Sequence, residues 1–298
     1  MFKDRDVICF LGDSITAGGI WMAEVYQILR KKHKIKCYNC GVSGGIARKA
    51  FHYLQSECLV FNPDYVSIMF GINDIDFALY KKENENLPDI QQKKKEAIDI
   101  CITHYRGILE QVEAAGAKPI ICIPVPYDDV SENETPVASC REGLEILESH
   151  LRSLAKEFDC KVVDFKTTFS KFLGKDDVMS EDRVHPTPKG HHIMAQTYLY
   201  EIGEIDKCDF ETPFEFEEWN EKRFEKEQQL LMTNFIEYCV LFDEGWLKDA
   251  SFEEKKKMAK KRYDEKEDKE AFTVYLKYIE NIDIRTKIRG EVVALTKF

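Results

Sequence analysis

Short apolar segments alternate with amphipathic segments along the first two thirds of the chain. The apolar segments have the length of strands, and the amphipathic ones repeat their apolar residues at helical spacing. Because parallel strands need crossover connections, this alternation predicts a parallel sheet with helices on both faces. The predicted strands span residues 7–11, 35–38, 65–70, 119–123 and 161–165. The predicted helices span residues 18–33, 46–58, 89–115, 137–158 and 188–202.

The pattern changes near Lys207, beyond which charged residues of both signs become frequent and Pro213 is the single proline. Apolar residues recur there at helical spacing, and Ser251 followed by Glu254 is typical of a helix N-terminus. We therefore expect a domain over residues 1–206 and an all-helical extension over residues 207–298. The extension is a candidate contact for a homo-oligomer, and its expected core residues are Tyr238, Phe242, Trp246 and Tyr275.

Composition argues against several classes of function. The formal net charge of −11 disfavours nucleic acid and anionic membrane surfaces as partners, since both are negatively charged. The mixed-sign run at residues 253–270 indicates a solvated helix face. No segment has the roughly 20 apolar residues of a membrane span, and the charged N-terminus lacks the pattern of a secretory signal. We expect a cytoplasmic protein with reduced thiols.

Ten cysteines occur in the chain, most of them in apolar segments where a free thiol behaves as a small hydrophobe. Cys37 and Cys40 form one C-x-x-C pair, but no second pair lies at the spacing of a zinc site. We therefore expect neither a metal nor a cofactor.

The segment "ICFLGDSITAGG", residues 8–19, places Ser14 where the first predicted strand ends. A phosphate-binding loop is disfavoured there, because the segment lacks lysine and Asp13 would repel a phosphate. Ser14 could serve only as a helix cap. As a nucleophile, it would instead need a general base, a group that orients this base, and oxyanion donors.

Candidates for all three roles follow later in the chain. The segment "EDRVHP" supplies Asp182 and His185, which can both face the sheet edge from one turn. "FGINDID" supplies Asn73, whose amide can donate to an oxyanion, and "NCGVSGGIA" supplies Gly44, where the backbone can approach a ligand closely. These segments favour the nucleophile interpretation of Ser14.

Taken together, the motifs resemble those of the GDSL-type, or SGNH, hydrolase family over about residues 5–205. The matching positions are Gly12, Asp13 and Ser14; Asn39, Gly41 and Gly44; Gly71, Asn73 and Asp74; and Asp182, His185 and Pro186. The resemblance implies a flavodoxin-like, three-layer α/β/α sandwich with a five-stranded parallel sheet. It also implies hydrolysis of esters, thioesters or acetylated sugars without a metal.

The resemblance further implies roles for single residues. Ser14 is expected to be the nucleophile, His185 its base, and Asp182 the acid that orients the histidine. The backbone N–H groups of Ser14 and Gly44 and the Asn73 amide are expected to form the oxyanion hole.

Four polar residues near these motifs are expected to be structural. Asp13 and Asp74 are interpreted as hydrogen-bond acceptors that shape turns. His191 and His192 are assigned to the last predicted helix.

Two alternatives stand beside this assignment. Residues 41–45 match the G-x-S-x-G motif of α/β-hydrolases, with Ser43 as the nucleophile. That interpretation leaves Ser14 and Asn73 without a role. The chain could also be a catalytically idle binding module that retains the pocket.

The sequence defines the substrate only in outline. The loop at residues 123–136 is polar and proline-rich, so Tyr127 and Asp128 are candidate substrate contacts, as is Trp21 near Ser14. We expect a serine hydrolase that forms an acyl-enzyme and prefers short acyl groups, as an acetyl esterase acting on carbohydrate does. Its expected partner is a small ester or acylated sugar. Alternatives within the family are a lysophospholipase and an acyl-thioesterase.

Overall fold

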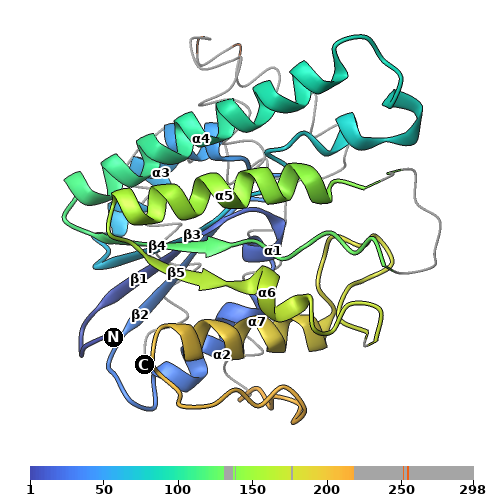
Figure 1. Ribbon diagram of the computed structural model, residues 1–298. Helices are drawn as coiled ribbons and strands as arrows, with labels where there is room; N and C mark the ends of the chain where they lie inside the picture. The colour runs from blue at the N-terminus through green and yellow to red at the C-terminus, as the bar shows by residue number, and fades with distance from the viewer. Residues whose placement is uncertain (131–136, 138, 176, 218–250, 252–253, 255–298) are drawn as a thin grey trace.

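The fold is organised around one sheet of five parallel strands (Figure 1). The computed structural model describes residues 1–130, 137, 139–175, 177–217, 251 and 254. The strands, in chain order, are β1 Val7–Gly12, β2 Lys36–Gly41, β3 Tyr65–Met69, β4 Lys118–Ile123 and β5 Lys161–Asp164. Their spatial order is β2-β1-β3-β4-β5, and every neighbouring pair is parallel. The order changes direction at β1, which favours a ligand crevice at the carboxyl ends of β1 and β3.

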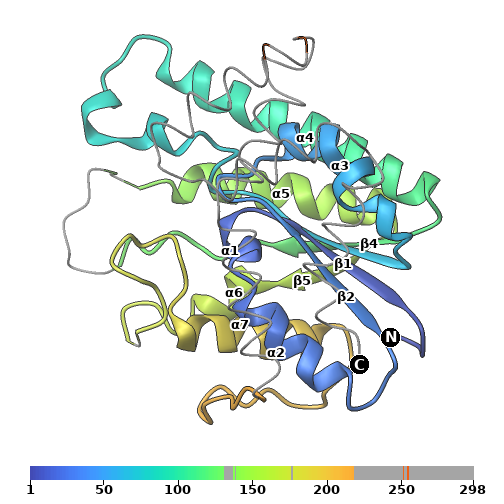
Figure 2. The same cartoon turned by 180° about the vertical axis from the view of Figure 1, so that it is seen from behind.

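Helices cover both faces of the sheet, as Figures 1 and 2 show from opposite sides. One face carries α3, α4 and α5, and the other carries α2, α6 and α7. The helices are α1 Ser14–Ala17, α2 Ile20–Leu29, α3 Ala47–Glu57, α4 Ile90–Ala114, α5 Arg141–Glu157, α6 Phe165–Phe169 and α7 Pro188–Glu201. Short 3₁₀ helices occur at Leu59–Phe61, Phe77–Tyr80 and Lys82–Asn84. The predicted three-layer α/β/α class is confirmed.

Strand β1 shows how the sheet separates two apolar cores. Successive side chains of a strand point to opposite faces. Ile8 and Phe10 lie in the core shared with α2 and α7, whereas Cys9 and Leu11 lie in the core shared with α3 and α4. Because both faces are buried, the strand has a continuous apolar sequence, which is why the sequence pattern locates it.

Two elements differ from their predicted bounds. The predicted helix at residues 18–33 is shortened to α2, which begins after Gly19 with its φ of 74°, and the short helix α1 precedes the predicted range. The predicted strand at residues 35–38 continues to Gly41 despite the polar Asn39. The Asn39 amide nitrogen donates to Ala17 O at 3.0 Å, and its oxygen accepts from Gly41 N–H at 2.9 Å. These bonds tie the end of α1 to β2.

The segment after α7 folds back along the helical layer that contains α2. The Gln27 side chain donates to Glu215 O at 2.9 Å and accepts from Glu217 N–H at 3.0 Å. Residues 207–217 contain no helix. This part of the extension therefore lies against the domain in an irregular conformation.

Only two residues are described farther along the extension. The Ser251 hydroxyl donates to Glu254 Oε2 at 2.7 Å, and Glu254 N–H donates back to Ser251 Oγ at 3.3 Å. This confirms the predicted helix-capping pair. The expected core residues of the extension lie outside the described residues: Tyr238, Phe242, Trp246 and Tyr275. Within the described part of the chain, no helix has the length and apolar character needed to span a bilayer.

Candidate active site

Ser14 begins α1, directly after the buried strand β1. Asp13 is the N-cap of this helix, and its Oδ1 accepts a hydrogen bond from Ile15 N–H at 3.0 Å. Gly12 permits the tight turn, because a Cβ at this position would clash with the Thr16 side chain and lie 2.7 Å from Met69 O of the neighbouring strand. The turn therefore presents the Ser14 hydroxyl at the carboxyl edge of the sheet.

The Ser14 hydroxyl contacts a histidine from a distant part of the chain, and this histidine is paired with an aspartate. Ser14 Oγ lies 2.7 Å from His185 Nε2, and His185 Nδ1 lies 2.5 Å from Asp182 Oδ2. The side chains of His185 and Asp182 are 44% and 51% exposed, so the site is open to solvent. A hydroxyl, an imidazole and a carboxylate in this order can generate a nucleophile.

The segment at residues 178–187 orients the aspartate. Asp182 Oδ1 accepts hydrogen bonds from the Val184 and His185 backbone N–H groups, both at 2.9 Å, and from the Ser180 hydroxyl at 2.8 Å. Oδ2 is thereby left for the histidine ring. Partial burial raises the pKa of Asp182, but the bonds from the His185 backbone and ring, Val184 and Ser180 outweigh it and lower the pKa to about 2. Asp182 is therefore a carboxylate at neutral pH.

The predicted oxyanion donors lie on the loops after β2 and β3. Gly44 is exposed and adopts a φ of 68°, and no atom lies within 4 Å of the position its Cβ would take. Asn73 Nδ2 donates to Gly45 O at 3.2 Å and so joins the two loops. The backbone N–H groups of Ser14 and Gly44 donate to no group in the described part of the chain. Both remain available to a ligand oxygen.

Comparison with known proteins identifies the family. The model of the GDSL-like lipase/acylhydrolase family matches residues 10–193, which is more than half of the chain. The chain belongs to this family. It is a GDSL-type serine esterase.

Two kinds of relative resemble this GDSL-type esterase. An acetylxylan esterase of Geobacillus stearothermophilus is 26% identical over 219 residues, which cover 66% of this chain and 93% of that protein. A crystal structure of an acetylxylan esterase from the same organism has a TM-score of 0.55 at 25% identity, covering 67% of this chain and 95% of that one. A gut microbial diltiazem-metabolizing enzyme has a TM-score of 0.61 at 21% identity, but this chain covers only 48% of it, so this likeness concerns the fold alone.

Ser43, the nucleophile of the alternative G-x-S-x-G interpretation, lies in the loop after β2. His185 Nε2 contacts the Ser14 hydroxyl, and the described structure gives this nitrogen no second hydroxyl. The arrangement of base and hydroxyl therefore favours Ser14 over Ser43.

Trp21 does not lie where a substrate can contact it. Its side chain is 1% exposed and packs edge-on against the rings of Phe10 and Phe165, with ring centroids 5.2 Å and 5.6 Å away. The expected substrate contact is therefore corrected to a core contact. An aromatic residue seven positions beyond a nucleophile has the same sequence signature in either position.

The other two predicted substrate contacts are also buried, within the loop after β4. Asp128 is 5% exposed, and its Oδ1 accepts from Val130 N–H at 3.1 Å. This carboxylate shapes its own loop. Tyr127 is 4% exposed, packs beside Phe77, and borders a cavity at the end of β4.

Buried residues of α7 include a histidine pair that the catalytic geometry does not use. His192 Nδ1 lies 3.0 Å from the Glu24 carboxylate, and its Nε2 lies 2.7 Å from Asp209 O. Burial lowers the pKa of the neighbouring His191 to about 3, assisted by the nearby His185. Both histidines lie on the last helix, α7, as expected, and Glu24 is a buried partner that sequence reasoning missed.

Two buried carboxyl groups lie beneath the candidate oxyanion loops. Asp74 Oδ1 accepts from Ala47 N–H at 2.7 Å and holds the loop that carries Gly44. Burial raises the pKa of Asp13 to about 6 and that of Asp74 to about 7. Both residues act as acceptors for backbone N–H groups, as their interpretation as turn-shaping residues requires.

Three thiols gather on the face of the sheet that packs against α3. The Sγ atoms of Cys9, Cys40 and Cys58 lie within 4.8 Å of one another, and all three residues are fully buried. Burial and the two neighbouring thiols raise the pKa of Cys9 well above its usual value. Because a metal binds the thiolate, this environment does not favour ligation.

Proposed function

We propose that the enzyme hydrolyses carboxylic esters through an acyl-enzyme on Ser14, and that its substrates are acetyl esters of carbohydrates. The observation that carries this proposal is the continuous contact from Ser14 Oγ through His185 to Asp182, at 2.7 Å and 2.5 Å. A serine hydroxyl is a weak nucleophile until an oriented base accepts its proton.

In the first half of the reaction, Ser14 Oγ attacks the ester carbonyl carbon while His185 Nε2 takes the hydroxyl proton. Asp182 Oδ2 accepts from His185 Nδ1–H and stabilises the imidazolium that forms. The tetrahedral intermediate collapses, the bond from carbon to the leaving oxygen breaks, and His185 gives its proton to the leaving alcohol.

In the second half, a water molecule attacks the acyl carbon and gives a proton to His185 Nε2. Collapse of the second intermediate breaks the ester bond to Ser14 Oγ, which regains the proton from His185. The carboxylic acid leaves, and the enzyme returns to its starting state.

Three hydrogen-bond donors are assigned to stabilise the negative charge that develops on the carbonyl oxygen. They are the Ser14 and Gly44 backbone N–H groups and the Asn73 side-chain amide. Their loops follow β1, β2 and β3 and meet at one edge of the sheet. The bond from Asn73 to Gly45 O keeps two of these loops in register. Preorganised donors of this kind stabilise the transition state more than the substrate.

The acetyl preference is supported by the relatives. The Geobacillus stearothermophilus protein is an acetylxylan esterase, and its solved catalytic mutants replace a serine, an aspartate or a histidine. These residue types are those of Ser14, Asp182 and His185.

A series of p-nitrophenyl esters from two to ten acyl carbons, together with acetylated xylo-oligosaccharides, tests the proposal. We expect the acetyl ester to turn over fastest and acetate to be released from the sugar. Ser14→Ala should lower kcat by about 10³-fold or more, whereas the matched variant Ser43→Ala should retain activity. Faster turnover of the ten-carbon ester, or full activity of Ser14→Ala, would overturn it.

A further inference from the structure

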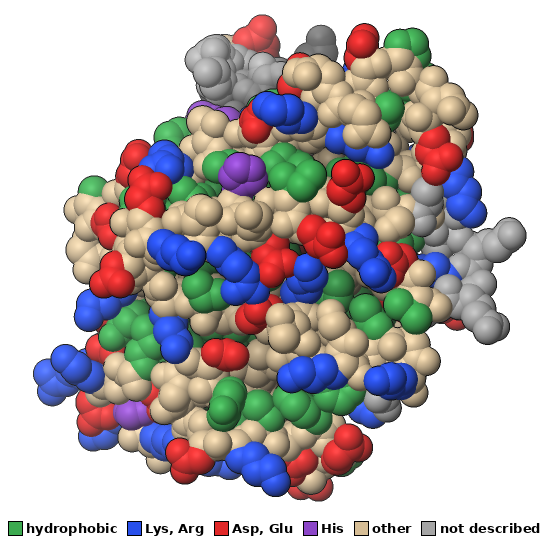
Figure 3. All heavy atoms as spheres, in the orientation of Figure 1, with side chains coloured by type: hydrophobic (Ala, Val, Ile, Leu, Met, Phe, Trp, Pro, Cys, Tyr) green, Lys and Arg blue, Asp and Glu red, His purple; other side chains and the backbone are tan. Residues whose placement is uncertain are grey.

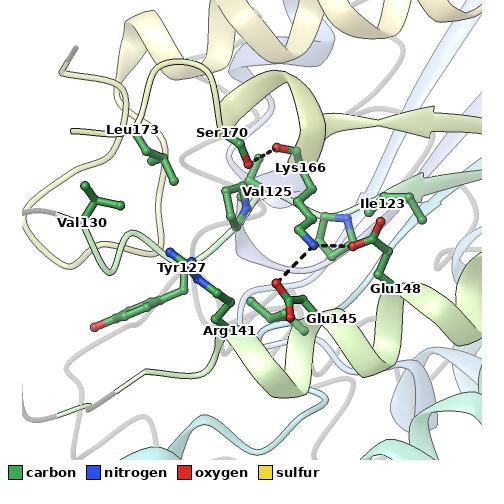
Figure 4. Close-up of a pocket in the computed structure, with 13 residues that line it drawn as sticks. Ile123, Val125, Tyr127, Val130, Arg141, Glu145, Glu148, Lys166, Ser170 and Leu173 are labelled. Carbon is green, nitrogen blue, oxygen red and sulfur yellow. Dashed lines mark hydrogen bonds and ion pairs between the residues drawn. The ribbon is translucent and has the colours of Figure 1, made fainter. Parts of the chain in front are cut away.

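A cavity of about 270 Å³ lies at the carboxyl ends of β4 and β5, at the same edge of the sheet as Ser14 (Figure 4). Its lining comes from the end of β4 and the following loop, from α5 and from α6. Ser14, Asp182 and His185 are not among its lining residues. The cavity is therefore a neighbour of the catalytic residues and separate from them.

One hydrogen bond links the cavity to the catalytic segment. Asp128 N–H donates to Arg183 O at 3.1 Å, so the loop beside Tyr127 is joined to the segment between Asp182 and His185. Neighbouring strands lie about 4.8 Å apart, which places β4 about 10 Å from β1 across β3. At this distance from Ser14, the cavity is too far away to hold the group that carries the reacting ester. It is suitably placed for a second unit that is covalently linked to that group.

The polar wall of the cavity is held in place by ion pairs (Figure 4). Lys166 of α6 points towards α5, with its Nζ 2.6 Å from Glu148 Oε2 and 3.8 Å from Glu145 Oε1. Arg141 Nε donates to Asp129 Oδ2 at 3.0 Å. These donors and acceptors are already oriented, so a ligand that bonds to them need not order them.

The charges of the lining select against ionic ligands. The lining contains two basic side chains, Arg141 and Lys166, and two acidic ones, Glu145 and Glu148. On the protein face shown in Figure 3, acidic and basic side chains are likewise interspersed. With no excess of either sign, the cavity favours a neutral ligand whose groups both donate and accept, as hydroxyl groups do.

The remaining lining is apolar and includes Val125, Leu144 and Leu173. Such side chains can contact the C–H groups of a sugar ring while the paired charges bond its hydroxyls. A long acyl chain would instead displace water from the charged side chains. It could not replace the hydrogen bonds that this water makes to them. The lining therefore fits a sugar better than a lipid.

We propose that this cavity is a subsite for a neutral sugar unit linked to the unit that carries the ester, an inference that rests on the proposed function. The subsite selects acetylated oligosaccharides over acetylated monosaccharides. It binds the sugar chain and takes no part in the chemistry at Ser14.

The test fills the cavity without touching the catalytic residues. Ser170 lines it, is exposed, and donates to the carbonyl four residues earlier, so Ser170→Trp places a large ring in the space. Ser153→Trp is the matched control, since Ser153 is an exposed helical serine with the same type of bond and does not line the cavity.

Two measurements are made on each variant: kcat/KM for acetylated xylotriose and for p-nitrophenyl acetate, and binding of unacetylated xylotriose by calorimetry. Ser170→Trp should lower kcat/KM for the oligosaccharide and weaken xylotriose binding, each by about tenfold. Its turnover of p-nitrophenyl acetate should stay within about twofold. Ser153→Trp should change none of these values.

The two proposals fail differently. If p-nitrophenyl acetate turnover survives Ser14→Ala, the proposed function is wrong, while xylotriose binding still reports on the cavity. Absence of xylotriose binding to the wild type, or equal effects of Ser170→Trp and Ser153→Trp, would overturn the subsite.

Discussion

Two histidine–carboxylate pairs in this molecule contain the same chemical groups but have different roles. His185 and Asp182 lie at the sheet edge, and His192, seven positions later, pairs with Glu24 inside the helical layer. In both pairs the carboxylate contacts the histidine Nδ1. The difference lies at the other ring nitrogen, which faces the Ser14 hydroxyl in the first pair and a backbone carbonyl oxygen in the second.

This difference sets the role that each ring can play. A hydroxyl can donate, so the His185 Nε2 can accept a proton from Ser14 and act as a base. A carbonyl oxygen only accepts, so the His192 ring donates at Nε2, and the Glu24 carboxylate at Nδ1 favours the imidazolium form. Burial lowers the pKa of His192, but the hydrogen bond and charge of Glu24 outweigh it and raise the pKa. One ring therefore faces a group that can give it a proton, and the other faces acceptors that favour its protonated form.

The buried pair fastens the segment after α7. His192 bonds to Asp209 O, while the Gln196 side chain donates to Glu24 Oε1 and accepts from Asp209 N–H. These four residues form a closed network between α2, α7 and the segment at residues 207–217. The comparison therefore predicts that mutations of the first pair affect turnover and mutations of the second affect stability.

The largest expected effect comes from replacing the two histidines in turn. His185→Gln removes the base and should lower kcat for p-nitrophenyl acetate by about 10⁴–10⁶-fold. His192→Gln, measured in the same assay, should stay within a few-fold of the wild type. Equal losses in the two variants would erase the distinction between the pairs.

Stability should show the reverse order. Glu24→Ala leaves the His192 cation buried without its partner, which typically costs about 3–5 kcal/mol of unfolding free energy. Asp182→Ala breaks a half-exposed pair and should cost less. Urea denaturation of both variants measures the difference. A larger loss of stability in Asp182→Ala would contradict the assignment of Glu24 and His192 to a structural network.

A smaller effect should appear in the pH dependence of stability. Because the folded-state pKa of His192 is raised, its stabilisation is complete below the unfolded-state pKa and is lost as the pH rises through the folded-state pKa. The difference in Tm between wild type and His192→Gln should therefore shrink from pH 5.5 to pH 9, a range chosen to span about 6.5, the usual histidine pKa. Asp13 and Asp74 also destabilise the fold as they ionise, since their pKa values are raised to about 6 and 7. Both residues are present in wild type and in His192→Gln, so their effect cancels in the difference in Tm. A difference that grows with pH would be inconsistent with a charged His192.

The sequence predicted the sheet well because its strands are buried on both sides. An apolar run such as that of β1 has few other structures available to it in an α/β chain. Polar positions limited the prediction elsewhere. Asn39 ends the apolar run of β2 early, although its buried side-chain amide both donates and accepts a hydrogen bond inside the protein.

The candidate site was predictable where chemistry fixes the residue type. Ser14, Asp182 and His185 follow from motifs, because a hydroxyl, a carboxylate and an imidazole are needed together. Glu24 was not predictable, since a glutamate in an amphipathic helix normally faces solvent. Its burial depends on a histidine in another helix, and one sequence contains no record of that contact.

Labelling with a fluorophosphonate, followed by peptide mapping, tests the central claim most directly, because the probe reacts with a serine only when a base activates it. We expect one adduct, on Ser14, that forms in the wild type and in His192→Gln at similar rates and is absent from His185→Gln. An adduct on Ser43, or labelling that is unchanged in His185→Gln, would contradict it.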